Sequence, residues 1–357
     1  MTEDLGSEAA RLLVDRAWEA YAEGRWQEAL SAAGRAAEAA TRLDDLVLLV
    51  RALSVEGEIL NMTGDFAGGL ARYTRILALA EDPATSHCLN DDDAARTVAS
   101  ARWNWVACAR YITSIPVRDL FGVLDAADRW LDVTGHRDWR ASVLSERADV
   151  HAALGEWDAA IACANEALLA KLRHPDAAGY NVAAYRHALG EILIDGGRAA
   201  EAVPHFRATL DDPRTDLWDQ HRSHQGLAEC ALAAGDLVAA EREMRRAVQR
   251  AESLGDDELC NSLGVLARVC QAAGDLTAAW QAAARRLEVA GRIGGHHRPY
   301  QAARVAVDIA LDRADYATAR RLLDDLDVHA RAMDAATATT TCAAEVAERR
   351  QRLEKLA

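Results

Sequence analysis

Alanine and leucine recur along the chain at helical spacing, and short polar turns interrupt them at regular intervals. Each turn is a glycine followed by a charged residue, as in Gly64-Asp65-Phe66. The unit recurs at Gly24, Gly64, Gly155, Gly197, Gly235 and Gly274, and Ala314 takes the place of the glycine in the last copy. Glycine is favoured where a helix ends in the left-handed conformation. The pattern therefore predicts repeated pairs of antiparallel helices.

The distances between successive turns are 40, 91, 42, 38, 39 and 40 residues. The double-length step implies one irregular repeat, which we place at 92–135, where Thr113-Ser114-Ile115-Pro116 replaces the glycine turn. Trp103, Leu120 and Trp130 keep helical spacing there, so we expect a helix pair with a distorted turn. Repetition at a fixed period is the signature of a solenoid.

Small residues stand at fixed offsets from the turns. Those seven residues before the turn are Ala17, Gly57, Ala148, Gly190, Ala228 and Ala267, and those five residues after it are Ala29, Gly69, Ala160, Ala202, Ala240, Ala279 and Ala319. A larger residue follows nine positions after four of the turns, at Tyr73, Phe206, Met244 and Leu323. Small residues let two helix backbones approach closely, and the larger ones fill the groove to the next pair.

This order of small residue, turn glycine, alanine and large residue resembles the tetratricopeptide repeat. The resemblance covers residues 10–327, and its period is near 40 rather than the usual 34. Longer units of this kind occur in kinesin light chain, in the sensor arms of bacterial transcriptional activators and in Rap-type regulators. The resemblance implies an all-α, right-handed superhelical solenoid of about eight antiparallel helix pairs. We assign 7–329 to this solenoid and 330–357 to a C-terminal capping helix.

The composition agrees with an all-α fold, because alanine and leucine favour helices and only 5% of the residues are aromatic. A net charge of -15 repels nucleic acid and anionic membranes and would attract a basic partner. No stretch approaches the length of a membrane span. Seven cysteines without a CxxC motif are typical of reduced thiols in a cytoplasmic protein. The Arg-rich, Lys-poor composition is typical of a bacterial genome with high GC content.

The first helix of each pair lines the concave surface of such a solenoid. The resemblance implies that the inward positions of this first helix lie about 10, 6 and 3 residues before the turn. One further position on the same face precedes these three. These columns form a polar stripe of candidate partner-binding residues: Arg51, Ser54, Glu58, Asn61, Ser145, Asp149, His187, Glu191, Arg222, Gln225, Glu229, Asn261, Arg268, Gln271, Gln301, Arg304 and Asp308. We expect Asn104 to hold the equivalent place in the irregular repeat. Such side chains can satisfy the backbone amides of an extended peptide. The alternative is that they form only the solvated stripe of amphipathic helices.

The first repeat carries Trp18 and Tyr21 at the equivalent positions, which gives the groove an aromatic end. Aromatic residues there can anchor an apolar side chain or a ring of a partner. Packing beneath an N-terminal segment is an equal alternative for these two residues.

The sequence gives little support for a metal-binding site. His221 and His224 stand three residues apart on one predicted helix, but a zinc site needs three or four converging ligands, and Cys230 is expected to face the core. We expect no metal and no cofactor.

Carboxylates could meet as acid and base partners, as Glu58 with Asp149, or Glu191 with Asp195 and Glu229. The chain carries no phosphate-binding loop and no GxSxG or HExxH motif, and we assign no catalytic residue.

Three functions follow from these features. The first is a non-catalytic scaffold or regulatory protein that holds a protein or peptide in its groove. The second is a sensor of a small molecule or signal peptide that acts by shape change on a partner. The third is an enzyme with its site in the groove, since a fold does not dictate function. Self-association through the exposed ends of the solenoid is a further expectation.

Overall fold

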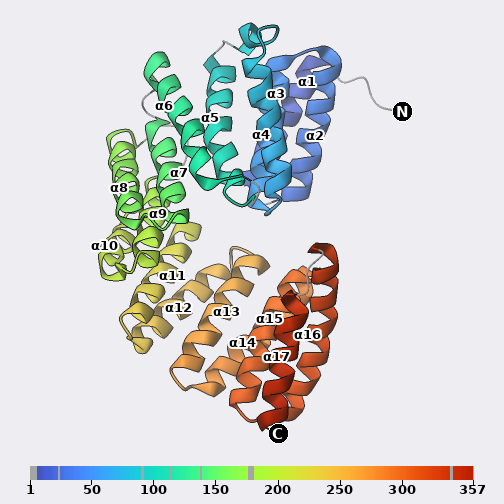
Figure 1. The fold of residues 1–357 in the computed structure, drawn as a ribbon, viewed down its shortest axis with the longest axis vertical. Helices are drawn as coiled ribbons and strands as arrows, with labels where there is room; N and C mark the ends of the chain where they lie inside the picture. Colours follow the sequence, from blue (N-terminus) through green and yellow to red (C-terminus); the bar gives the residue numbers. More distant parts are fainter. Residues whose placement is uncertain are drawn as a thin grey trace. The chain divides into compact units, whose positions relative to one another are not determined.

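The computed structural model describes residues 6–22, 25–89, 92–112, 115–136, 139–175, 181–337 and 341–356. Within these ranges it is all-helical, with seventeen α-helices, two short 3-10 helices and no strand (Figure 1). The α-helices are α1 (Ser7–Ala22), α2 (Trp26–Leu43), α3 (Leu46–Met62), α4 (Phe66–Glu81), α5 (Asp92–Ala109), α6 (Leu120–Thr134), α7 (Arg140–Ala153), α8 (Trp157–Arg173), α9 (Val182–Asp195), α10 (Ala199–Leu210), α11 (Leu217–Ala233), α12 (Leu237–Ala251), α13 (Asp256–Ala272), α14 (Leu276–Ile293), α15 (His297–Asp312), α16 (Tyr316–Thr337) and α17 (Thr341–Leu356). The predicted all-α helical-repeat fold is confirmed.

The helices form two compact units, an N-terminal unit (Met1–Tyr185) and a C-terminal unit (Arg186–Ala357), and the boundary between them falls within α9. In the described part of the chain, no helix combines the length and the apolar character needed to cross a membrane.

The turns inside the pairs use one residue to end a helix and the next to begin another. Gly64 has a φ of +85°, and the amide of Asp65 donates to the Leu60 carbonyl at 2.8 Å, which closes α3 in a Schellman motif. The Asp65 carboxylate then accepts the amide of Gly68 at 2.9 Å and caps α4. The turn predicted at Gly24 lies outside the described residues.

The same arrangement closes three later pairs, where the capping carboxylates are those of Asp236, Asp275 and Asp315. In the last of these turns Ala314 adopts a φ of +57°, a left-handed conformation that is costly for a residue with a Cβ atom.

Two of the small residues in the repeat columns, Gly57 and Gly190, stand where a large ring packs against the helix backbone. The Phe206 ring lies between α9 and α11: a Cβ atom on Gly190 would come within 2.4 Å of it, and one on Gly226 within 2.3 Å. Gly57 faces the Tyr73 ring in the same way, at 2.7 Å. Glycine at these positions is therefore a steric requirement of the close helix packing.

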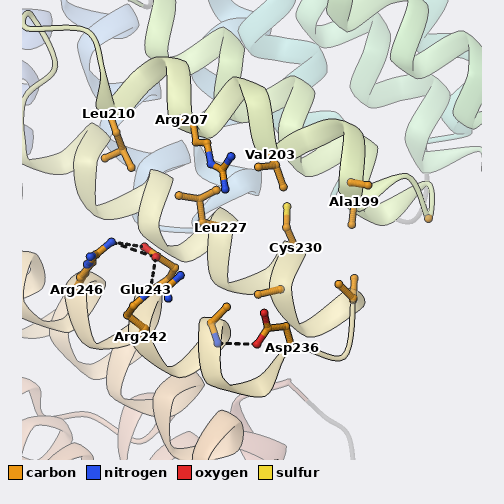
Figure 2. A pocket seen from close by; sticks show the side chains of 16 residues that line it. Ala199, Val203, Arg207, Leu210, Leu227, Cys230, Asp236, Arg242, Glu243 and Arg246 are labelled. Carbon is orange, nitrogen blue, oxygen red and sulfur yellow. Dashed lines mark hydrogen bonds and ion pairs between the residues drawn. The ribbon is translucent and has the colours of Figure 1, made fainter.

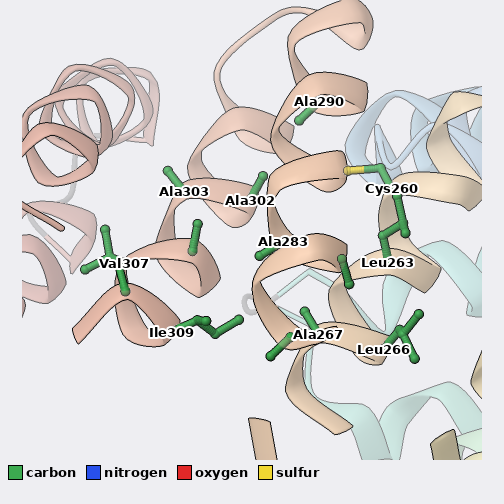
Figure 3. Close-up of a cluster of buried hydrophobic side chains, with 14 of the residues drawn as sticks. Cys260, Leu263, Leu266, Ala267, Ala283, Ala290, Ala302, Ala303, Val307 and Ile309 are labelled. Carbon is green, nitrogen blue, oxygen red and sulfur yellow. The ribbon is translucent and has the colours of Figure 1, made fainter. Parts of the chain in front are cut away.

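The core of the C-terminal unit is built mainly from alanine and branched aliphatic side chains of α13, α14 and α15 (Figure 3). Ala267, Ala283 and Ala303 are buried at the helix crossings, and Leu263 and Val307 fill the spaces around them. Small side chains at the crossings allow the close packing that the repeat pattern predicted.

The stretch 92–135 contains α5 and α6. Pro116 precedes a short 3-10 helix at Val117–Asp119, while residues 113–114 lie outside the described part. Leu120 and Leu124 are fully buried in a cluster that also includes Trp103.

The boundary expected after residue 329 falls inside α16, and α17 follows as a separate helix. The buried carboxylate of Asp334 in α16 accepts the amides of Cys342 and Ala343, at 3.1 and 2.8 Å, and so caps α17. Arg349 of α17 donates to Asp308 of α15 at 2.9 Å.

Candidate functional site

A pocket of about 470 Å³, which we call the inner pocket, opens on the first helices of the pairs in the N-terminal unit. Six of its lining residues were expected from the sequence: Trp18, Tyr21, Arg51, Ser54, Glu58 and Asn104. Seven others complete it: Asp93, Arg96, Thr97, Ser100, Trp103, Trp139 and Ser142. The pocket thus gathers residues from α1, α3 and α5 with the start of α7.

Glu58 joins three other residues through hydrogen bonds in the inner pocket. Its carboxylate accepts hydrogen bonds from the hydroxyls of Tyr21 and Tyr73, both at 3.3 Å, and from the Asn104 amide at 3.4 Å. Burial raises the pKa of Glu58, and the two tyrosine hydrogen bonds oppose that rise. These contacts join α1, α4 and α5 to α3.

Aromatic rings occupy two sides of the pocket. The rings of Trp18 and Tyr21 pack edge to face with centroids 5.5 Å apart, and those of Trp103 and Trp139 are 5.3 Å apart. Trp18 is 40% exposed, so a ligand can reach its ring. Such surfaces favour apolar or aromatic groups of a ligand.

Hydroxyl and amide groups supply the polar part of the lining. The hydroxyls of Thr97 and Ser100 donate to carbonyls of their own helix, both at 2.9 Å, which leaves their oxygen atoms able to accept. Ser142 shares a hydrogen bond of 3.1 Å with Tyr185. With two arginines and two carboxylates in the lining, the pocket offers both donors and acceptors in balanced number.

Three further inner-face candidates of this unit do not line the pocket. Asp149 forms an ion pair with Arg110 at 2.9 Å, and Arg110 also lies 3.4 Å from Glu146. Burial raises the pKa of Glu146 above its usual range. The partners of Asp149 and Glu58 in these contacts thus differ: Arg110 for Asp149, and Tyr21, Tyr73 and Asn104 for Glu58. Asn61 and Ser145 are half-buried.

In the C-terminal unit, most of the inner-face candidates contact side chains on neighbouring helices. The contacts are Arg222 with Glu191, Gln225 with Ser262 at 3.3 Å, Asn261 with Arg298 at 2.7 Å, Gln271 with Asp312 at 2.5 Å, Arg304 with Glu345 at 3.1 Å, and Asp308 with Arg349 at 2.9 Å. The Gln301 carbonyl accepts from Arg286 at 3.0 Å, and Arg268 is exposed. These polar columns therefore link successive first helices.

The negative charges of Glu191 and Asp195 act on the carboxylate of Glu229. Desolvation and the charges of the other two raise the pKa of Glu229, while Arg222 and Arg268 oppose the rise. Because arginines surround this group, it forms part of a mixed-charge surface.

His187 was expected on the inner face, but the structure buries its imidazole completely. Its Nε2 atom lies 2.8 Å from the Ser223 hydroxyl, and its Nδ1 atom lies 3.9 Å from Asp219. The residue types match those of a serine-hydrolase triad, but all three side chains are buried and the Asp219 distance exceeds a hydrogen bond. The cluster therefore joins α9 to α11, with no access for a substrate.

His221 and His224 bind different partners. His221 contacts the Ala247 carbonyl at 3.1 Å and Glu258 at 3.5 Å, whereas His224 contacts Glu243 at 2.9 Å. Cys230 lies in the packed part of α11, where burial raises the pKa of its thiol to about 11. Among the described residues, no three metal-binding side chains converge.

Sequence reasoning missed seven lining residues, five of which lie on α5 of the irregular repeat. Asp93, Thr97 and Ser100 share the Asn104 face of α5, but without a turn glycine the register of this repeat had no reference point. Ser142 stands 13 residues before Gly155, in the same column as Arg51, so the pattern did contain a signal for it.

No protein-family model matches the chain, and no curated protein matches it significantly. Among solved structures, a Rap protein complexed with competence and sporulation factor is 14% identical, with 99% of this chain and 100% of that chain covered and a TM-score of 0.52. The apo form of RapI is 11% identical, with coverages of 97% and 98% and a TM-score of 0.56. The apo quorum sensor NprR from B. thuringiensis is 12% identical, with coverages of 98% and 99% and a TM-score of 0.53.

The fold is that of a tetratricopeptide-type helical-repeat protein. At these levels of identity the likeness concerns the fold alone. The resemblance drawn from the turn and small-residue columns is confirmed.

Proposed function

We propose that this tetratricopeptide-type protein is a non-catalytic regulatory or scaffolding protein that binds an extended peptide segment. The inner pocket holds an apolar or aromatic side chain of that segment, and the polar lining satisfies the adjoining backbone. The observation that carries the proposal is the convergence of aromatic rings, hydroxyls, an amide and charges of both signs in one pocket of about 470 Å³.

The chemistry of the lining suits a peptide backbone, which presents one donor and one acceptor per residue. The oxygen atoms of Thr97, Ser100 and Asn104 can accept amide protons, and Arg51 and Ser54 can donate to carbonyls. Trp18 supplies rigid, exposed apolar area at low entropic cost.

Two similar structures support a regulatory ligand-binding role. The Rap protein was solved with competence and sporulation factor bound, and NprR is a quorum sensor. The net charge of -15 adds an attraction for basic residues next to the docked segment. We propose that the chain works in the cytoplasm, where its seven free cysteines stay reduced.

The test is selection of binders from a random dodecapeptide library on the full chain, followed by fluorescence anisotropy with the selected peptides. Asn104→Ala removes an amide that holds Glu58 and faces the ligand, and we expect about tenfold weaker binding. Asn165→Ala is the matched control, because the Asn165 amide donates to Ile161 within α8 at 3.0 Å and does not line the inner pocket. Equal affinities for the two variants, or a library without binders, would contradict the proposal.

A second candidate function is a small-molecule sensor. A volume of about 470 Å³ lies within the range of small-ligand sites. A thermal-shift screen with metabolites distinguishes the two functions: a compound that raises the melting temperature of the wild type, and not of Asn104→Ala, would favour the sensor.

A further inference from the structure

A second and larger cavity, of about 910 Å³, lies in the C-terminal unit. Its walls are α10 and α12, the second helices of two successive pairs, and its floor is the intervening helix α11. In Figure 2, Val203 and Arg207 point from α10 toward Leu227 and Cys230 of α11. We call this cavity the α10–α12 groove, and it shares no residue with the inner pocket.

The floor of the groove and, apart from Arg207, its α10 wall are apolar. Val203, Leu210 and Leu227 are half-buried and leave part of their side chains open to the groove, while alanines form most of the remaining surface. An apolar slot of this size on a protein surface marks a place where another apolar surface is buried.

The described residues that line the α10–α12 groove include no hydroxyl or amide side chain. Its side-chain hydrogen-bonding groups are the arginines and carboxylates alone, so an extended peptide on the apolar floor would leave most of its backbone amides without partners, which is costly. A helix satisfies its own backbone and presents only side chains, so it is the form of chain that this groove accepts. α10 has 12 residues, which corresponds to about 18 Å and about three helical turns.

Three arginines line the groove against two carboxylates. Arg242 and Arg246 both contact Glu243, at 3.2 and 3.1 Å, so two guanidinium groups share one carboxylate. That carboxylate also accepts from His224 at 2.9 Å. Arg207 is exposed, and the described residues provide no ion pair for it. The side chains that line the groove thus carry one more positive than negative charge, in a chain whose net charge is -15.

We propose that the α10–α12 groove is a docking site for an acidic amphipathic helix of a partner protein. The apolar face of that helix lies on Val203, Leu210 and Leu227. Its carboxylates meet Arg207, Arg242 and Arg246, where Arg207 supplies an unpaired charge and the other two gain a second anion. This interaction is independent of the inner pocket.

The experiment uses the full chain and a fluorescein-labelled 16-residue probe peptide with leucine on one helical face and glutamate on the other. Anisotropy should show saturable binding that weakens between 50 and 200 mM NaCl, because the contacts are charged. Arg207→Glu should weaken binding by about tenfold or more. Arg320→Glu is the matched control, since Arg320 is also exposed on the second helix of a pair, α16, and lies outside the groove.

Two further measurements address the form of the ligand and its position. A probe with a central proline cannot stay helical and should lose most of its affinity. Hydrogen exchange should show protection in 199–210 and 227–246 when the probe binds. The proposal is overturned by equal effects of Arg207→Glu and Arg320→Glu, by full binding of the proline probe, or by protection elsewhere. Concentration-dependent dimerisation that Arg207→Glu abolishes would assign the groove to a second copy of the chain and would also overturn it.

Discussion

The ring of Tyr73 lies over the backbone of Gly57, so that a Cβ atom on Gly57 would come within 2.7 Å of the ring. The hydroxyl of the same ring donates to Glu58 at 3.3 Å. One side chain therefore fixes the close crossing of α3 with α4 and holds the central carboxylate of the inner pocket. The repeat architecture and the candidate site are coupled at this point.

Gly57→Ala should destabilise the protein by about 1–3 kcal/mol, because the added methyl group forces the buried Tyr73 ring to move. Gly122→Ala is the control: a Cβ atom there meets nothing within 4 Å, and alanine is the better helix former, so stability should rise by up to about 1 kcal/mol. Urea unfolding followed by circular dichroism measures both changes. The same sign for the two substitutions would contradict the packing described.

Ala314→Gly should stabilise the C-terminal unit by about 1 kcal/mol. Ala314 has a φ of +57°, and glycine adopts this conformation without the steric cost that a Cβ atom causes. The reverse change, Gly274→Ala at a φ of +79°, should cost a similar amount. Thermal unfolding of the two variants should shift the midpoint in opposite directions, and a lower midpoint for Ala314→Gly would refute the argument.

His187 should make stability depend on pH. Burial, together with Arg222 and Arg186, lowers the pKa of His187 to about 3, although Asp219 opposes this change. The unfolded chain binds a proton near pH 6.5 that the folded chain does not, so stability is complete above that pH and falls as the pH drops toward 3. The expected slope from this residue is about 1.4 kcal/mol per pH unit.

The check is the free energy of unfolding of wild type and His187→Gln between pH 7 and pH 5. The variant should lose less stability over this range than the wild type, whatever its stability at pH 7. His174→Gln replaces an exposed histidine and should leave the wild-type pH dependence intact. Parallel curves for wild type and His187→Gln would show that His187 does not carry the effect.

Asp334→Ala should loosen α17, because it removes the carboxylate that caps the amides of Cys342 and Ala343. We expect a loss of about 1–2 kcal/mol and faster hydrogen exchange throughout α17. Asp324→Ala, on the same helix, removes only an exposed ion pair with Arg350 and should change stability by less than about 1 kcal/mol. Unchanged exchange in α17 of Asp334→Ala would mean that other contacts hold this helix.

The fold could be predicted from the sequence because its turns carry a strict local requirement. A residue in the left-handed conformation followed by a capping aspartate, as in Gly64-Asp65, can be recognised from the local sequence, because it does not depend on distant contacts. The ring of Tyr73 requires a residue without a side chain at position 57, so this contact also appears in the sequence, as Gly57. These local rules repeat at a constant period, and the register of the helices follows from them.

The candidate site was only partly predictable, because a column of inward positions does not reveal which side chains bind one another. Glu58 and Asn104 line the inner pocket, whereas Asp308 from an equivalent column binds Arg349. His187 occupies an inward position, yet its helix is packed closely enough to bury it. The α10–α12 groove leaves no periodic signal, since it depends on the spacing between two helices.

The central claim is that the inner pocket binds an extended peptide, and hydrogen exchange of the full chain with a library-selected peptide tests it most directly. The account predicts that protection on binding concentrates in 51–58 of α3 and 93–104 of α5, the segments that supply most of the polar lining. Protection confined to other helices, with these two segments unchanged at saturating peptide, would contradict it.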